Sequence, residues 1–369
     1  MPNVSTLKQK KLKQNKLSRN HFCLVQRSYI CIYLLILMSI SWTMNLEYHL
    51  PEIKLSNKQL KEVFPDWDYQ SFEQKVGIHS RFIAAKNETA LDLAEKASLS
   101  LLEKIDRNEI DFVLLCTQSP DYFLPTSACI LQQRLGLSKK CGALDFNLGC
   151  SGYVYGLALA KGLLSANIAS QVLLIVAETY SKHLHPGDRV NRAIFGDAAA
   201  ATLVTKDSFK IGEFVLGTDG NGYQDLIVKN GGFKNKSLIE ANDYEYGTGN
   251  ITSDNHLYMN GSSIYSFTIA NIPDLVSHTA VKNSITLDEV DYFIFHQANQ
   301  FMLEYLRKKI KIDPAKFCID MAETGNTASA TIPIALKNAL TNGVINTGDK
   351  VMLVGFGVGL SWGATIITI

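Results

Sequence analysis

The feature of this sequence that most constrains its fold is a strand–helix–strand pattern that occurs twice. NEIDFVLLC (108–116) resembles DEVDYFIFH (288–296) at an offset of 180 residues. GCSGYVYGLALAKGLLSA from Gly149 resembles GNTASATIPIALKNALTN from Gly325 at an offset of 176, and QVLLIVAE resembles KVMLVGFG at an offset of 179. Chance similarity among apolar strands is the alternative, but three segments in one order at nearly one offset indicate a duplicated half.

The pattern around these segments predicts an α/β fold. Residues 89–105 have helical periodicity and begin with Thr-x-x-Asp, a capping box. DFVLLCT (111–117) is a short apolar run of the kind found in buried strands, and similar runs alternate with helical segments along the chain. Helices that alternate with apolar strands predict a mostly parallel sheet covered on both faces. Residues 217–262, rich in Gly, Asn and Asp, are predicted to form an irregular segment.

Composition excludes several classes of function. The 369 residues, with 46% hydrophobic and 19% charged side chains and a formal net charge of +1, describe an ordinary globular protein large enough for two packed halves. No basic stripe interleaved with aromatic residues points to nucleic acid. The seven cysteines are widely spread, without CxxC pairs or zinc-ligand spacing. We therefore expect no disulfide framework, no metal site and a reducing compartment.

The N-terminal segment departs from this composition. A basic stretch, KQKKLKQNKLSR (8–19), precedes fourteen mostly apolar residues, YICIYLLILMSISW (29–42). This order suggests a signal peptide or a membrane anchor, although a membrane-spanning helix needs about 20 residues. The alternative is a functional chain that starts at Met38 or Met44. We expect residues 1–37 to be an extension and leave membrane association open.

Cys150 is the first candidate for chemistry. It stands in DFNLGCSGYVYGL, where an apolar strand runs into a turn and a helix is predicted to begin. The unpaired amides and the dipole of a helix N-terminus stabilise a thiolate, which lowers its pKa and raises the reactive fraction. Gly152 and Gly156 within that helix suggest the close approach of a neighbour or a substrate. The alternative is that Cys150, like the other six cysteines, is a buried apolar residue.

The duplication connects two further polar residues with Cys150. Asn326 occupies the equivalent helix start in the second half, and His296 ends the apolar strand DYFIFH. Chemistry in parallel α/β proteins gathers at the carboxyl ends of strands and the helix starts that follow, so the three could converge where the halves join. A structural histidine and a capping asparagine are the alternatives. The glycine-rich GFGVGLSWG (355–363) could bring backbone amides to the same site.

Together these motifs resemble the beta-ketoacyl-ACP synthase III (3-oxoacyl-[acyl-carrier-protein] synthase III) family, which has the thiolase-like fold. The match begins near Tyr48 and covers most of the rest of the chain. In order, its motifs are YHLPE, GIHSRFIAAKNET, FLPTSACILQQRLG, DFNLGCSGYVYGL, IFGDAAAATLV, HQAN, GNTASATIPIAL and GFGVGLSWG. Each is weak alone, but their joint order and spacing are specific. The resemblance implies two duplicated halves in a five-layered αβαβα arrangement, which we place at 38–210 and 211–369.

The resemblance also implies an acyltransferase mechanism. Cys150 would attack an acyl thioester and hold the acyl group. Malonyl-ACP would then enter, and His296 and Asn326 would donate hydrogen bonds to its thioester carbonyl as CO2 leaves. The amides of Cys150 and Val358 would form an oxyanion hole, although the family's three consecutive glycines read Gly-Val-Gly at 357–359 here. The product would be a 3-oxoacyl thioester for fatty-acid or secondary-metabolite synthesis.

Substrates and partners are implied in the same way. The family uses an acyl-CoA or acyl-ACP primer, acyl carrier protein, and no metal or redox cofactor, and it is a cytoplasmic homodimer. Leu124, in the loop 121–125, resembles the segment that reaches into the partner's acyl pocket. Two positions depart from the family: Ser71, beside Phe72, replaces a tryptophan that stacks on the adenine of CoA, and Gln300 follows HQAN where a basic residue is common. Both departures weaken the expected contacts with CoA and carrier protein.

Two other functions fit the same residues. One is a same-fold acyltransferase that passes the acyl group from Cys150 to an alcohol or amine without decarboxylation. The other is a non-catalytic acyl-binding protein tethered through the N-terminal segment. Release of CO2 from malonyl-ACP separates the condensing enzyme from the simple acyltransferase, and the presence of Cys150, His296 and Asn326 together argues against a binding protein.

Overall fold

The structure, a computed structural model, describes residues 44–207, 209–236, 241–247 and 249–369. The prediction of an extension or anchor over residues 1–37 therefore lies outside the described residues. In the part of the chain that is described, no helix combines the length and the apolar character needed to cross a membrane.

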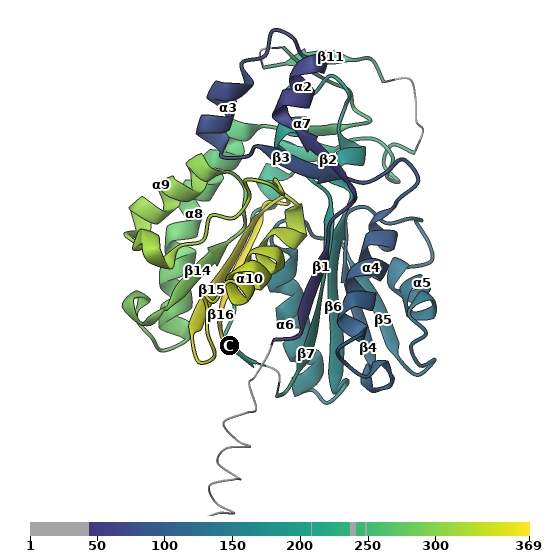
Figure 1. Ribbon diagram of the computed structural model, residues 1–369, viewed down its shortest axis with the longest axis vertical. Helices are drawn as coiled ribbons and strands as arrows, with labels where there is room; N and C mark the ends of the chain where they lie inside the picture. Colours follow the sequence, from purple (N-terminus) through teal and green to yellow (C-terminus); the bar gives the residue numbers. More distant parts are fainter. Residues whose placement is uncertain (1–43, 208, 237–240, 248) are drawn as a thin grey trace, which may run out of the picture. The chain divides into compact units, whose positions relative to one another are not determined.

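Two five-stranded sheets form the framework (Figure 1). The first has the order β1-β7-β6-β4-β5. Its strands are β1 (Leu46–His49), β4 (Phe112–Cys116), β5 (Gly142–Phe146), β6 (Gln171–Glu178) and β7 (Ala198–Thr205). In the second sheet the order is β14-β15-β16-β8, with β9 also paired to β16. Its strands are β8 (Lys210–Ile211), β9 (Val215–Thr218), β14 (Tyr292–Phe295), β15 (Lys350–Gly357) and β16 (Ser361–Thr368).

The repeat seen in the sequence is a repeat of strand pairing. β4 pairs in parallel with β6, and β14 pairs in the same way with β15. An antiparallel strand then follows in each half, β7 beside β6 and β16 beside β15. The predicted boundary between the halves, at 210/211, stays a proposal; it falls within β8, which pairs with the last strand of the chain.

The expectation of mostly parallel sheets is wrong. The second sheet has one parallel pair, β14 with β15, while β16 is antiparallel to β15, β8 and β9. In the first sheet β1 and β7 are likewise antiparallel to their neighbours. A continuous apolar run reports burial on both faces of a strand, and strands in a central position between helical layers have such runs whatever their direction.

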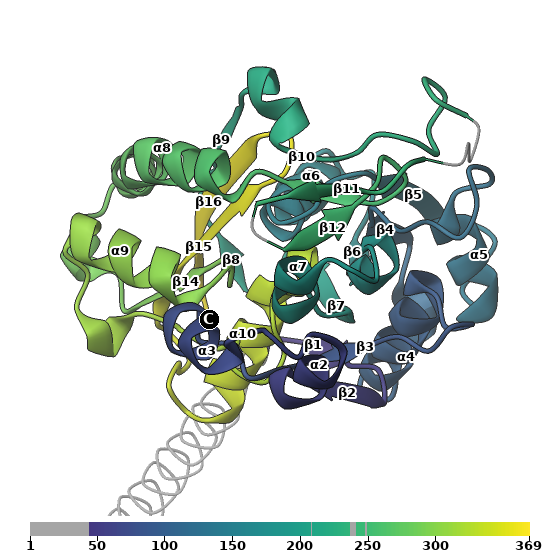
Figure 2. The same ribbon diagram turned by 90° about the horizontal axis from the view of Figure 1, so that it is seen from above.

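Helices and sheets alternate in five layers, as predicted (Figure 2). Helices α4 and α5 cover the outer face of the first sheet, α6 and α10 lie between the sheets, and α8 and α9 cover the outer face of the second. Their bounds are α4 (Ala90–Leu102), α5 (Ser127–Arg134), α6 (Gly152–Ser165), α8 (Gly261–Lys282), α9 (Gln300–Ile310) and α10 (Thr331–Thr341). Along β4, Leu114 points into the core around α6 while Val113 and Leu115 face α4, so strand alternation fills both layers.

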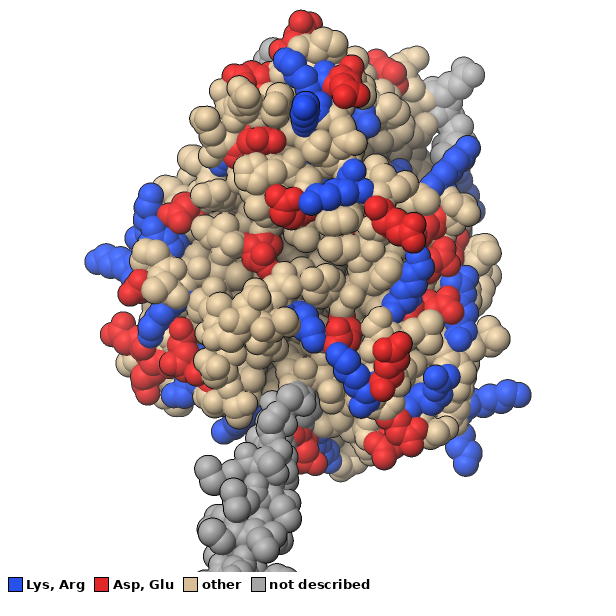
Figure 3. Space-filling view, in the orientation of Figure 1, with Lys and Arg blue, Asp and Glu red and all other residues tan. Residues whose placement is uncertain are grey.

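Smaller elements lie above the layers in Figure 1. They are β2 (Ile53–Ser56), α2 (Asn57–Val63), α3 (Tyr69–Val76), β3 (Ser80–Ile83) and α7 (Arg189–Ile194). Short 3-10 helices lie at Arg107–Glu109, Tyr180–His183, Gly220–Asp225, Leu287–Glu289, Pro314–Lys316 and Ala328–Ala330. On the face drawn in Figure 3, acidic and basic side chains are interspersed, which fits the net charge of +1.

The described parts of 217–262 are more regular than predicted. They contain two short antiparallel ribbons, β10 (Leu226–Val228) with β13 (Leu257–Met259) and β11 (Tyr244–Tyr246) with β12 (Asn250–Thr252). Three-residue strands among glycines and asparagines are too short to show a periodic pattern in the sequence. The β10–β13 ribbon buries its apolar face in the cluster that contains Cys150.

The glycines of α6 are explained by neighbouring strands. A Cβ on Gly156 would lie 2.5 Å from Cδ1 of Leu174, and a Cβ on Gly152 would lie 2.4 Å from Sγ of Cys116. Helix α6 therefore packs closely on β4 and β6, which confirms the expected approach of a neighbour. A Cβ on Gly162, in the same helix, would have no packed neighbour within 4 Å.

Gly156→Ala and Gly162→Ala form a matched pair. We expect Gly156→Ala to lower the free energy of unfolding by roughly 1–3 kcal/mol, because the added methyl group overpacks a buried contact. Gly162→Ala should raise it by up to about 1 kcal/mol, because it meets nothing and improves helix propensity. Urea denaturation followed by circular dichroism measures both, and equal effects of the two substitutions would contradict the packing.

Candidate active site

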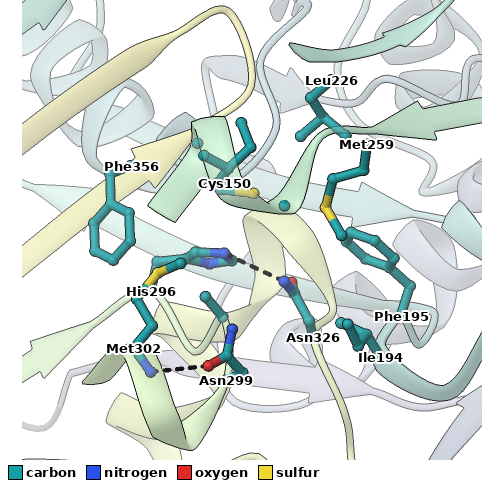
Figure 4. Close-up of a pocket in the computed structure, with 14 residues that line it drawn as sticks. Cys150, Ile194, Phe195, Leu226, Met259, His296, Asn299, Met302, Asn326 and Phe356 are labelled. Atoms are coloured by element: carbon teal, nitrogen blue, oxygen red, sulfur yellow. Dashed lines mark hydrogen bonds between the residues drawn. The ribbon is translucent and has the colours of Figure 1, made fainter. Parts of the chain in front are cut away.

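Cys150, His296 and Asn326 line one cavity of about 80 Å³ (Figure 4). Each comes from a different element: the turn before α6, the end of β14 and the loop before α10. The rest of the lining is largely apolar, including Ile194 and Leu226. The three predicted residues are thus brought together where the two halves meet.

Two glycines of β15 allow the turn that contains Cys150 to pack directly against this strand. A Cβ on Gly357 would lie 2.8 Å from Sγ of Cys150, and one on Gly355 would lie 2.8 Å from Cα of Ser151. The side chain of Ser151 is in turn within hydrogen-bond distance, 2.8 Å, of the Ser361 hydroxyl. The glycine-rich motif therefore lets a strand of the second half lie directly on the cysteine of the first.

The resting Cys150 is a protonated thiol. Burial raises the pKa of Cys150 to about 12, although hydrogen bonds with the backbone of Val358 and of Cys150 itself lower it. The expectation that the helix start lowers this pKa is wrong for the closed cavity. The free energy of removing a thiolate from water exceeds the stabilisation that the helix N-terminus gives it. A buried thiol in this state needs a base before it can act as a nucleophile.

His296 is a neutral imidazole at rest. Its backbone N–H donates to the carbonyl of Val354 at 2.7 Å, so the pairing of β14 with β15 fixes the position of the His296 backbone. Burial lowers the pKa of His296 to about 3, partly offset by a hydrogen bond with the backbone of Ala328. Its Nδ1 lies 2.7 Å from Oγ1 of Thr331, and its ring meets Phe356 edge-on at 5.6 Å.

Asn326 has a fixed orientation. Its backbone N–H donates to the carbonyl of Ile194 at 2.8 Å, and its carbonyl accepts from Gly196 at 3.0 Å, which ties the loop to the first half. The side-chain Oδ1 accepts from the backbone N–H of Ala328 at 2.9 Å. The amide Nδ2 therefore faces Nε2 of His296, 3.4 Å away.

Known proteins resemble this chain in both sequence and fold. The family model described as 3-Oxoacyl-[acyl-carrier-protein (ACP)] synthase III matches residues 144–220, and the model of its C-terminal part matches residues 281–369. The beta-ketoacyl-[acyl-carrier-protein] synthase III of Clostridium perfringens is 34% identical over 322 residues, which are 86% of this chain and 95% of that protein. This chain belongs to the 3-oxoacyl-[acyl-carrier-protein] synthase III family.

Solved structures of the family superpose on the chain. A 3-oxoacyl-(acyl-carrier-protein) synthase III solved at 2.1 Å is 47% identical, with a TM-score of 0.86 over 88% of this chain and 98% of that one. The beta-ketoacyl-[acyl carrier protein] synthase III of Thermus thermophilus is 32% identical, with a TM-score of 0.78 over 88% and 98% of the two chains. The thiolase-like fold predicted from the motifs is confirmed.

Glu178, at the end of β6, does not line the cavity but acts electrostatically on Cys150, and the sequence analysis missed it. Its buried carboxyl accepts hydrogen bonds from the backbone N–H of Gln118 at 3.1 Å and from the hydroxyls of Ser119 and Ser329, each at 3.2 Å. Burial raises the pKa of Glu178 to about 8. The repeat could have pointed to this residue. At the offset of 179 residues, Glu178 corresponds to Gly357, which lies against Cys150.

The other predicted residues are not among those that line the cavity. Leu124 is 79% exposed on the loop after β4. Phe72 packs edge-on against Trp67, 5.2 Å between ring centroids. Gln300 begins α9, and next to it Phe301 lies with Nζ of Lys75 5.4 Å from its ring centroid. Across the described ranges, no three His, Cys, Asp or Glu side chains are grouped to bind a metal ion.

Glu178→Gln should flatten the pH dependence of stability. Between its ordinary pKa of 4.5 and about 8, the Glu178 proton is kept by the folded chain and lost by the unfolded one. Its stabilising contribution is therefore complete below pH 4.5 and is lost as the pH rises towards 8. Glutamine carries no such proton.

The measurement is urea unfolding of both proteins at pH 5.5 and pH 8.5. The wild-type protein should lose on the order of 3 kcal/mol more than Glu178→Gln between these values. Equal losses in the two proteins would show that Glu178 ionises normally in the folded chain.

Proposed function

We propose that this chain catalyses the decarboxylative condensation of an acyl thioester with malonyl-ACP through an acyl group held on Cys150. The observation that supports it most is the convergence of Cys150, His296 and Asn326 on one apolar cavity. The product is a 3-oxoacyl-ACP, in keeping with the names of the relatives. The family requires no metal or redox cofactor, and the proposal gives none a role.

Acylation comes first. The sulfur of Cys150 attacks the primer's thioester carbonyl, and an acyl-cysteine replaces the donor thioester. The backbone N–H groups of Cys150 and Val358 are the proposed oxyanion hole, since the backbone of both residues already interacts with the thiol. A backbone amide serves this role whatever the side chain, so valine at position 358 is compatible with it.

Condensation uses the other two residues. The malonyl thioester places its carbonyl oxygen between Nδ2 of Asn326 and Nε2 of His296, which lie 3.4 Å apart. Hydrogen bonds from both groups stabilise the enolate that forms as CO2 leaves, provided that Nε2 carries a proton. The enolate carbon then attacks the acyl group on Cys150. A simple acyltransferase has no enolate and no use for this pair of donors.

The compartment is part of the proposal. All five cysteines in the described residues are free thiols, which supports a reducing compartment and hence a cytoplasmic enzyme. Acyl carrier protein delivers malonate, and either acyl-CoA or acyl-ACP delivers the primer.

Intact-protein mass spectrometry tests the first step. Incubation with acyl-CoA and acyl-ACP donors should add one acyl group to the wild-type protein and none to Cys150→Ala. Asn326→Ala should still acquire the acyl group, while its condensation with malonyl-ACP falls by roughly 100- to 1,000-fold for loss of one oxyanion donor. If Asn326→Ala condenses at the wild-type rate, the assigned role of the asparagine is wrong.

We also propose that the chain forms a homodimer through the loop that holds Leu124. Phe123 and Leu124 are each 79% exposed, and Phe123 meets the exposed ring of Phe233 at 6.1 Å. A contiguous apolar patch of this kind is unusual on the surface of a monomer. Strand β5 is also an edge strand of the first sheet, and its Leu144 is exposed. A second copy of the chain can cover this free edge.

Leu124→Asp should weaken the dimer. A carboxylate at this position would have to be desolvated when the patch is covered, so dissociation should increase by at least about tenfold. Val281→Asp, at a 74% exposed position on α8, is the matched control and should leave association unchanged. Sedimentation velocity over a concentration series measures both, and a monomeric wild-type protein would contradict the proposal.

A further inference from the structure

Thr331 lies behind His296, on the opposite side of the ring from Asn326. It is the first residue of α10, and its side chain is buried. Its hydroxyl oxygen is 2.7 Å from Nδ1 of His296 and 3.0 Å from the backbone oxygen of Ala328, to which it donates. The hydroxyl therefore joins the imidazole to a carbonyl acceptor inside the protein.

These contacts decide which ring nitrogen carries the proton. A neutral imidazole has one N–H donor and one acceptor nitrogen. Asn326 points Nδ2 at Nε2, because its Oδ1 is held by the N–H of Ala328. Nε2 must then accept, and Nδ1 must donate, to the hydroxyl of Thr331 and to the backbone oxygen of Ala328, which also accepts the proton of Thr331. The other tautomer would set two donors against each other across 3.4 Å.

We propose that Thr331 is a positioning residue that helps to hold the proton of His296 on Nδ1 and so keeps Nε2 as the acceptor nitrogen that takes the proton of Cys150. This inference rests on the proposed function, which it deepens by naming the residue that sets the tautomer of His296. Figure 4 shows the Cys150 sulfur and the His296 ring on the same cavity, with the amide of Asn326 facing a nitrogen of the ring.

The protons of the reaction balance when His296 has this role. As the Cys150 sulfur bonds to the acyl carbon, its proton moves to Nε2, and the donor's carbon–sulfur bond breaks. The donor leaves as a thiolate and takes a proton from water. The overall reaction needs this proton because the malonyl carboxylate leaves as neutral CO2.

Once Nε2 carries the proton, it no longer accepts from Nδ2 of Asn326. The malonyl carbonyl oxygen then takes the place of that contact and accepts from both Nε2–H and Nδ2. When the enolate carbon displaces Cys150 from the acyl group, the thiolate takes the proton back from Nε2. The Thr331 hydroxyl accepts from Nδ1–H throughout, and this hydrogen bond strengthens when the ring is charged. One residue thus supports His296 as an acceptor in the first step and as a donor in the second.

Thr331→Val and Thr331→Ser form a matched pair. Valine keeps the branched shape but has no hydroxyl, while serine keeps the hydroxyl. We expect Thr331→Val to slow acylation of Cys150 by roughly 10- to 100-fold, the worth of a hydrogen bond to a charged group, with little change in KM for the donor. Thr331→Ser should stay within about threefold of the wild-type rate. Quenched-flow mass spectrometry measures both rates, and a Thr331→Val protein that acylates as fast as wild type would overturn the proposal.

Nitrogen-15 NMR of the histidine side chains reads the tautomer directly, with His296→Gln to assign the signals. The wild-type and Thr331→Ser proteins should show a proton on Nδ1 of His296, and Thr331→Val should shift the population towards Nε2–H. A wild-type ring protonated on Nε2 contradicts the proposal even if no variant folds. Absence of any acyl-enzyme in the wild type would instead count against the proposed function, so the two failures are distinguishable.

Discussion

Gly357 lies so close to Cys150 that a Cβ at this position would be 2.8 Å from the sulfur. This contact presses the last part of the second half onto the turn that begins α6 in the first. This packing places the thiol beside the backbone of Val358 and encloses the cavity. It also brings His296, at the end of β14, to the same cavity. The duplication explains why such a contact exists, because equivalent strands end and equivalent helices begin on either side of one joint.

Enclosure then determines the chemistry. Burial disfavours the charged form of every titratable group in the site, so Cys150 and Glu178 hold their protons and His296 is neutral at rest. The thiol is consequently inert until a substrate and a base act on it together. An enclosed, apolar site also strengthens each hydrogen bond offered to an enolate, because electrostatic interactions are stronger where the dielectric constant is low.

Much of the fold and of the candidate site could be predicted from the sequence, and some parts could not. The constant offset between the repeats predicted the strands and central helices, and equivalent positions within the repeats pointed to Cys150 and Asn326. The direction of the strands was not predictable, because apolar runs report burial and not pairing. Nor was the pKa of Cys150, because desolvation depends on side chains such as Leu226 that arrive from a ribbon of three-residue strands. Glu178 went unnoticed because a glutamate after an apolar run normally marks a strand that ends in solvent.

The central claim is that the acyl group on Cys150 is consumed by a carbon nucleophile formed through loss of CO2. A single-turnover experiment tests it: isolated acyl-enzyme is mixed with carboxyl-labelled malonyl-ACP, and acyl-enzyme, labelled CO2 and product are followed together. The account predicts that acyl-enzyme disappears as CO2 and 3-oxoacyl-ACP appear in equal amounts. Loss of the acyl group to water or to another acceptor without CO2 would contradict it.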